Sequence, residues 1–249
     1  MKSRFRFKSL FRELSLQFMY LLPARFVLRG LLNIENWIYY LVGRVATHAN
    51  GGVHPKHRFL KYHGFFINHI QHGDKVLDIG CGNGVVALDI AQKTEAKVTG
   101  IDSDATKIAE AITRGKGSLV KFVVGDVLEN LPEESFDVVI LSNVLEHLPD
   151  RIGFLLRLVS SAHPSRLLIR VPLFDRDWQV ALKRELGVEW RLDPTHFIEY
   201  TLETFTAKVQ SAHLAILLLE VRWGEIWAVT VPSETKKIAI HDIKKFNPK

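Results

Sequence analysis

The sequence predicts a doubly wound α/β fold with a mostly parallel, seven-stranded sheet, an antiparallel hairpin at its C-terminal end and a helical extension at its N-terminal end. Three observations predict it. From Lys75 onward, short apolar runs alternate with helical patterns, as in consecutive βαβ units. A glycine-rich segment follows the first apolar run. The last two runs are separated by four residues, which is too short for a parallel crossover.

Five nearly continuous apolar runs are expected to form parallel strands, because helices would then cover both faces of the sheet. They are KVLDIG (75–80), KVTGID (97–102), VKFVVGD (120–126), FDVVILSN (136–143) and RLLIRVPL (166–173). Helical patterns stand between them at GVVALDIAQK (84–93), DATKIAEAITR (104–114) and RIGFLLRLVSS (151–161). The runs AILLLEV (215–221) and IWAVTV (226–231) predict the hairpin.

Charge and patterning divide the chain into a basic extension (1–53), an α/β domain (54–233) and a basic tail (234–249). Residues 1–70 hold eleven Lys and Arg against two Glu, whereas residues 71–233 hold 17 against 23 Asp and Glu. A basic segment joined to an acidic domain suggests contact with an anionic surface. The content of 47% hydrophobic residues allows a sizeable core. The single cysteine, Cys81, excludes an intramolecular disulfide and a cysteine-based zinc cluster.

The N-terminal extension predicts two helices. In the first, apolar residues recur at spacings of three and four; they are Phe7, Leu10, Phe11, Leu14, Phe18, Leu21 and Leu22. This helix would lie in a membrane surface or pack on the domain or a partner. The second helix carries Leu31, Ile34, Trp37, Ile38, Leu41 and Val45 and ends at Asn50-Gly51-Gly52.

The apolar runs of the extension are too short to cross a membrane, and no clear signal-peptide cleavage site follows them. The first 30 residues, rich in arginine and with one acid, also fit a mitochondrial presequence. We expect a cytoplasmic protein with peripheral contact at the inner face of the membrane.

The strongest motif is VLDIGCGNG, residues 76–84, which follows a predicted strand and opens a helix. Its glycines allow a tight turn and let a ligand lie against bare backbone. Ligands of doubly wound sheets bind beyond the carboxyl ends of the strands. The dinucleotide fingerprint requires Gly-x-Gly-x-x-Gly, but the third glycine here, Gly84, comes one residue early. NAD(P) binding is therefore the weaker interpretation.

The pattern Asp78-x-Gly80-x-Gly82-x-Gly84 resembles the first motif of class I S-adenosylmethionine-dependent methyltransferases. The resemblance spans residues 54–231 and implies a Rossmann-like methyltransferase fold with S-adenosylmethionine as cofactor. In that family an acid like Asp102 holds the ribose, one like Asp126 reads the adenine amino group, and Val127 would touch the adenine face. Asn143 would lie near the methionine end. The cofactor-binding residues so implied are Asp78, Gly80, Cys81, Gly82, Gly84, Asp102, Ser103, Asp126, Val127 and Asn143.

A narrower resemblance lies in NVLEHLPD, residues 143–150. The segment is similar to ubiquinone-biosynthesis-type O-methyltransferases and their bacterial relatives, some of which carry Glu-x-x-Glu-His and bind a divalent metal. Glu146 and His147 match that pattern, but Asn143 replaces the first acid. Loss of a charged oxygen ligand weakens a hard-cation site, so we predict no metal. His147 is a candidate base, or a structural histidine at the mouth of the pocket.

A second candidate base, His196, stands in DPTHFIEYT, residues 193–201. Asp193 and Pro194 predict a turn before a helix, in an insertion after the fifth strand. In the resembled family such insertions shape the acceptor pocket. A neutral imidazole suits removal of a hydroxyl proton near pH 7. The alternative is a histidine bonded to the local backbone.

The sequence thus predicts methyl transfer from S-adenosylmethionine to a hydroxyl of a sugar, a lipid-linked intermediate or a small metabolite, with peripheral membrane contact through the N-terminal helix. Three alternatives stay open: an RNA or protein methyltransferase, an NAD(P)-binding protein, and a non-catalytic scaffold. Nucleic acid is not expected as a partner, because no dedicated RNA-binding module is recognisable and Ser142-Asn143-Val144-Leu145 replaces an NPPY-type amine motif.

Overall fold

The computed structural model describes Glu13, Gln17 and residues 19–233. The chain forms two compact units, one made of residues up to Pro55 together with Asp177–Pro194, and the other of Lys56–Arg176 with the chain from Thr195 onward. From the sequence, residues 177–194 were assigned to the α/β domain, whereas in the structure they pack with the N-terminal segment. The predicted basic tail and most of the predicted first helix lie outside the described residues.

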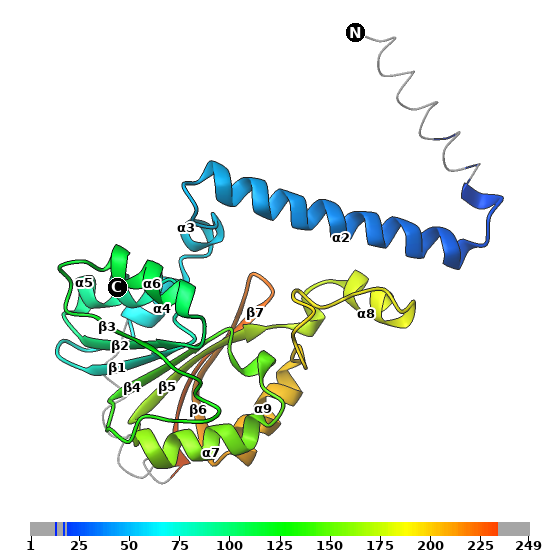
Figure 1. The fold of residues 1–249 in the computed structure, drawn as a ribbon. Helices are drawn as coiled ribbons and strands as arrows, with labels where there is room; N and C mark the ends of the chain where they lie inside the picture. The colour runs from blue at the N-terminus through cyan, green and yellow to red at the C-terminus, as the bar shows by residue number, and fades with distance from the viewer. Residues whose placement is uncertain (1–12, 14–16, 18, 234–249) are drawn as a thin grey trace. The chain divides into compact units, whose positions relative to one another are not determined.

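The second unit is built on a seven-stranded sheet of order β3-β2-β1-β4-β5-β7-β6 (Figure 1). The first five strands pair in parallel, and β7 runs antiparallel to both neighbours. This topology confirms the predicted doubly wound sheet with a terminal hairpin. The strands are β1 (Lys75–Ile79), β2 (Lys97–Asp102), β3 (Lys121–Val124), β4 (Val138–Ser142), β5 (Arg166–Pro172), β6 (Leu214–Arg222) and β7 (Glu225–Pro232).

The hairpin is tighter than the sequence suggested. Arg222 pairs with Glu225, so the loop consists of Trp223 and Gly224 alone. Both have positive φ, 54° and 74°, as a type I′ turn requires at its two central positions. The turn matches the twist of the flanking strands and so allows β7 to continue pairing with β5.

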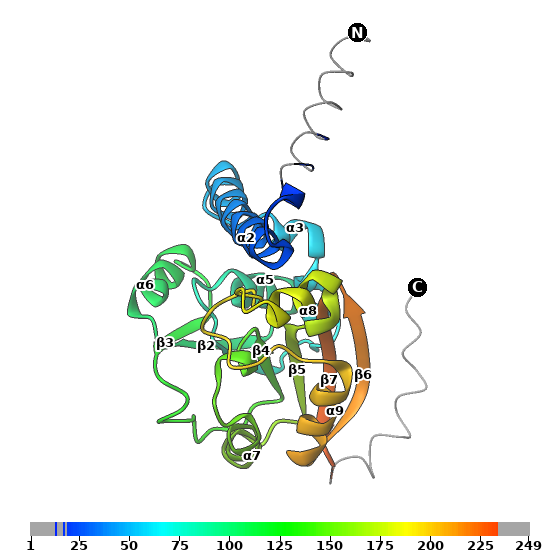
Figure 2. The same cartoon turned by 90° about the vertical axis from the view of Figure 1, so that its right-hand side faces the viewer.

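Helices cover both faces of this sheet (Figures 1 and 2). One face carries α4 (Tyr62–Ile67), α5 (Val85–Thr94) and α6 (Ala105–Arg114), and the other carries α7 (Arg151–Ala162) and α9 (Leu202–Ser211). Each layer encloses an apolar core, because the strands present buried residues on both faces. Short helices α3 (Lys56–Leu60), η1 (Leu145–His147) and η2 (Phe174–Arg176) complete the unit.

The helix expected directly after Asp193-Pro194 does not form, so that detail of the prediction was wrong. α9 starts only at Leu202, where the Thr201 side chain accepts a hydrogen bond from the Thr204 backbone N–H. Before it, Tyr200 forms an isolated parallel bridge with Leu173, the residue directly after β5. The capping threonine supplies the start signal that the turn at Pro194 lacked.

The first unit consists of α2 (Ala24–Ala49) and a segment containing α8 (Trp178–Glu185). The predicted second helix and its end are confirmed, since α2 is capped by Asn50 and followed by two glycines of positive φ. Leu32 packs with Leu186 and Val188, and the Asn36 amide donates to the Glu189 carbonyl (2.7 Å). No helix among the described residues is long and apolar enough to cross a membrane.

Candidate active site

The glycine-rich loop between β1 and α5 has left-handed backbone at Gly80, Gly82 and Gly84, with φ of 68°, 56° and 76°. A Cβ on Gly80 would come within 2.8 Å of Val144, and one on Gly84 within 2.6 Å of Phe122. These two glycines therefore let neighbouring elements approach. A Cβ on Gly82 would meet nothing within 4 Å. Its backbone borders open space, where a ligand can lie against it.

Asp102 at the end of β2 holds this loop. One of its carboxylate oxygens accepts a hydrogen bond from the Gly82 backbone N–H (2.8 Å), and the other accepts one from the Asp104 N–H (2.9 Å). A carboxylate has about four acceptor positions, so acceptor capacity is left for ligand hydroxyls. Ser103, the next residue, is exposed.

Asp78 lies in β1 just before this loop, and Cys81 lies within the loop. Burial, followed by the charge of Asp102, raises the pKa of Asp78 to about 7. One oxygen of Asp78 has no hydrogen-bond partner among the described residues. Burial also raises the pKa of the Cys81 thiol, so this cysteine is a protonated packing group and not a nucleophile.

The remaining predicted cofactor residues follow β3 and β4. Asp126 is exposed, and its carboxylate accepts from the Leu128 N–H (2.8 Å). Val127 packs against the core. Asn143 has φ of 57° and a buried side-chain oxygen with no hydrogen-bond partner among the described residues. The ten predicted residues therefore lie at the carboxyl ends of β1 to β4 or just beyond them, where doubly wound folds bind ligands.

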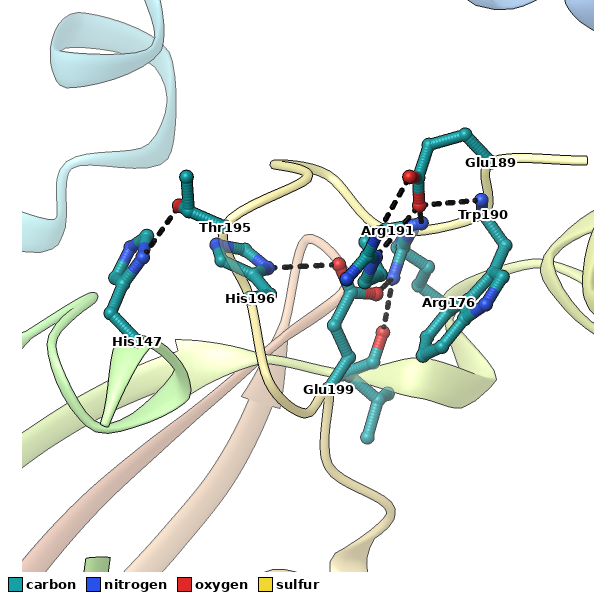
Figure 3. Close-up of polar contacts among 9 residues, drawn as sticks. His147, Arg176, Glu189, Trp190, Arg191, Thr195, His196 and Glu199 are labelled. Carbon is teal, nitrogen blue, oxygen red and sulfur yellow. Dashed lines mark hydrogen bonds and ion pairs between the residues drawn. The ribbon is translucent and has the colours of Figure 1, made fainter. Parts of the chain in front are cut away.

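The two predicted bases come together, although they are far apart in the chain. The His147 and His196 rings lie 4.6 Å apart between centroids, at an interplanar angle of 79°. The Thr195 hydroxyl is 2.9 Å from Nδ1 of His147. Figure 3 shows His196 between His147 and Glu199. Two adjacent imidazoles beside the end of β4 can accept or donate protons at a bound ligand.

Backbone hydrogen bonds hold the segment that carries His196. The Phe197 N–H donates to the Glu146 carbonyl (2.8 Å), which joins the segment to η1. The Tyr200 N–H donates to the Pro172 carbonyl (3.1 Å), and the Phe174 N–H donates to the Tyr200 carbonyl (2.7 Å). The segment is thus fixed both to η1, which follows β4, and to the end of β5.

Comparisons with known proteins agree with this geometry. A family model described as a methyltransferase domain matches residues 76–164. This match identifies a methyltransferase domain within the chain. Its cofactor is S-adenosylmethionine. The fold resembles magnesium protoporphyrin IX methyltransferase from Synechocystis PCC 6803, solved with bound SAH, with a TM-score of 0.57 and 18% identity over 70% of this chain and 84% of that chain.

Among curated relatives, the ubiquinone biosynthesis O-methyltransferase of Rhodopseudomonas palustris strain BisA53 is 31% identical over 58% of this chain and 59% of its own length. Ajmaline N-methyltransferase of Rauvolfia serpentina is 34% identical over 41% of this chain and 37% of its own. The matches thus span about half the length of these relatives. They include both an O- and an N-methyltransferase.

In this methyltransferase domain we expect Asp102→Ala to weaken S-adenosylmethionine binding by about 1.5–3 kcal/mol, the usual loss for hydrogen bonds to a charged partner. The variant also removes the acceptor that holds the Gly82 N–H. Isothermal calorimetry measures the affinity, with Glu110→Ala on the exposed side of α6 as the control. Equal affinities of the two variants would contradict the assignment of Asp102.

Among the described residues, one group of His, Cys, Asp or Glu side chains is close enough to hold a metal ion. It consists of Glu146, His147 and His196, whose possible ligand atoms lie within 4.8 Å of one another. Mg²⁺ and Ca²⁺ prefer several oxygen ligands. This group offers two imidazoles and one carboxyl, which is fewer oxygen ligands than these cations prefer. That no metal binds therefore stays our prediction, tested by chelator titration of methyl transfer.

The buried Glu146 predicts a pH-dependent stability. Its carboxyl keeps a proton in the folded state up to about pH 8 but loses it near 4.5 when unfolded, so the free energy of unfolding falls as pH rises between these values. Glu146→Gln should remove that decline and stabilise the protein at pH 8 by on the order of a few kcal/mol. Urea unfolding at about pH 5 and 8 measures this, with exposed Glu203→Gln as control. If the free energy of unfolding depended on pH in the same way in the variant and the wild type, this prediction would be contradicted.

Three charged side chains of the methyltransferase domain were not predicted from the sequence. Arg170 and Glu225 form a buried, bidentate ion pair between β5 and β7, at 2.6 and 2.7 Å. The Arg170 guanidinium also lies 3.9 Å from the Tyr62 ring centroid. Arg170 interrupts one apolar run and Glu225 directly precedes another. These charges were the available signal, since buried charges are generally paired. The third charged side chain, Glu199, lies against His196.

Proposed function

We propose that this chain transfers the methyl group of S-adenosylmethionine to a hydroxyl of a sugar, a lipid-linked intermediate or a small metabolite. The observation that carries the proposal is the pairing of His147 with His196, at a centroid distance of 4.6 Å, beside the carboxyl end of β4. Proton removal matters for a hydroxyl acceptor, because a neutral hydroxyl is a weak nucleophile. The similarity to a ubiquinone biosynthesis O-methyltransferase supports an oxygen acceptor.

When bound, S-adenosylmethionine supplies an activated methyl group, whose bond to sulfur breaks with its electron pair leaving on the thioether. The loop at Gly82 and the carboxylate of Asp102 would bind and orient the cofactor. An acceptor oxygen forms the new bond to the methyl carbon, and His196 or His147 accepts the hydroxyl proton. Alignment of the reacting atoms accounts for much of the remaining rate acceleration.

A methyl-transfer screen with radiolabelled S-adenosylmethionine tests the proposal. Matched acceptor pairs that differ only in a hydroxyl or an amine should show label on the hydroxyl compound. Label on RNA or protein would instead support the corresponding alternative. Calorimetry with S-adenosylmethionine and NADH distinguishes the other two alternatives. An NAD(P)-binding protein would bind NADH, whereas a non-catalytic scaffold would bind S-adenosylmethionine without transferring label.

We also propose that α2 contacts an anionic membrane surface. The apolar stripe predicted from the sequence is exposed along the helix, from Leu31 through Trp37 to Val45. By helical periodicity it lies opposite Leu32, which packs on Leu186 within the same unit. The helix carries three arginines against Glu35, and Glu35 pairs with Lys183 (3.2 Å). Exposed apolar side chains with surplus positive charge fit a surface of anionic lipids.

Replacement of Trp37, which is 62% exposed, by Ala should weaken binding to vesicles of phosphatidylcholine and phosphatidylserine several-fold, because indole favours the membrane interface. The affinity for S-adenosylmethionine should not change. Trp223→Ala is the matched control, as that tryptophan is 72% exposed in the hairpin. Vesicle sedimentation measures binding, which salt should weaken. Equal losses in both variants would contradict a role for α2.

A further inference from the structure

Glu199 is buried beside His196 and has a fully buried side chain. One carboxylate oxygen, Oε1, lies 3.1 Å from Nδ1 of His196. The other, Oε2, accepts from the Arg176 guanidinium, which also donates to the Leu173 carbonyl (2.9 Å). Figure 3 shows the resulting order of His147, His196, Glu199 and Arg176. Each oxygen of Glu199 is therefore assigned to a different partner.

We propose that Glu199 is a positioning residue that fixes the tautomer and orientation of His196, with the Nδ1 atom protonated and the Nε2 atom carrying the lone pair. The proposal rests on the function proposed above only in assigning the proton acceptor to His196. The tautomer itself follows from the hydrogen bonds.

Arg176 determines the hydrogen-bonding state of Glu199, because its guanidinium donates hydrogen bonds and accepts none. Its ion pair keeps the Glu199 carboxylate ionised, and an ionised carboxylate only accepts. A neutral His196 must then donate from Nδ1, which leaves Nε2 as the basic nitrogen. A carboxylate behind an imidazole both selects the tautomer and stabilises the imidazolium that forms when the ring accepts a proton.

The same contacts predict an unusual effect of Glu199→Gln. A glutamine has one accepting and one donating end. Arg176 can only donate, so it would bind the amide oxygen and turn the NH₂ group toward His196. The Nδ1 atom would then have to accept, and the proton would move to Nε2. An isosteric change would thereby invert the tautomer and remove the lone pair needed to accept the proton of a hydroxyl.

Long-range ¹H–¹⁵N correlation spectra of histidine-labelled full-length protein measure the tautomer directly. We expect protonated Nδ1 in the wild type and protonated Nε2 in Glu199→Gln. Turnover of Glu199→Gln should fall about 10²- to 10⁴-fold, with the affinity for S-adenosylmethionine unchanged. Glu203→Gln, on the exposed first turn of α9, should change neither quantity.

A double variant provides the rescue. With Arg176→Met, no guanidinium binds the amide oxygen of Glu199→Gln. The amide can then present its oxygen to His196, so the tautomer and part of the turnover should return. A wild type with protonated Nε2, or a folded Glu199→Gln variant that keeps the wild-type tautomer, would overturn the proposal. If the tautomer inverts as expected while the wild type methylates no acceptor, the positioning role stands and the proposed function fails.

Discussion

Gly82→Val should abolish measurable S-adenosylmethionine binding, with at least a roughly 100-fold loss, or about 2.7 kcal/mol. A Cβ at this position meets no protein atom within 4 Å, so the valine side chain would occupy space that a ligand needs. The Gly82 N–H also joins the loop to Asp102, and a β-branched residue resists the φ of 56° found there. Calorimetry on the folded variant measures the loss.

Backbone strain alone could weaken the protein, and Gly117→Val controls for it. Gly117 has φ of 88°, and a Cβ added there would likewise meet no atom within 4 Å, but this glycine lies in the turn before β3 and away from the loop. Both variants should lose similar stability, about 1–3 kcal/mol. Normal cofactor binding by folded Gly82→Val, or equal loss in both variants, would refute the loop as the cofactor site.

His196→Ala should lower turnover about 10²- to 10⁴-fold, the range expected for loss of a general base, while the cofactor affinity stays nearly intact. His196 lies against His147 and Glu199, and none of the predicted cofactor contacts involves it. Rate measurements at saturating donor and acceptor give the effect on turnover, and calorimetry gives the affinity. His147→Ala should show the same separation.

Because His196 is 4% exposed, His196→Gln serves as a second variant that keeps most of the side-chain volume. His72→Ala, at an exposed pair with Glu95, controls for general effects of removing an imidazole. If neither His196 nor His147 changes turnover more than a few-fold, alignment of the reactants alone would suffice. The acceptor would then be already acidic or a neutral nitrogen, and O-methylation would lose its main support.

The strands of the sheet and the terminal hairpin were predictable because they follow from local pattern. Apolar runs of strand length alternate with helical periodicity from β1 to β3 and again from β4 to β5, and the short link between β6 and β7 excludes a crossover. The glycine loop was predictable for a similar reason, since its spacing is contained within one short segment, residues 76–84. The positions of Asp102, Asp126 and Asn143 then follow, because consecutive parallel strands end at one edge of the sheet.

Contacts between distant residues were not predictable in this way. The sequence does not show that Arg176 meets Glu199, because the two are joined only after the chain has left β5 and returned. The burial of Glu146 was hidden for a similar reason, as a carboxyl in NVLEHLPD looks suited to a solvated turn. The association of residues 177–194 with α2 depends on Leu32, Leu186 and Val188, which no local periodicity connects.

The backbone bonds that tie Tyr200 to Pro172 and Phe174 close the chain on itself immediately around residues 177–194. The two histidines, Glu146 and Glu199 all lie in the unit outside this excursion. The side chains that we propose for proton transfer therefore belong to one compact unit, although the chain leaves that unit between the residues that supply them.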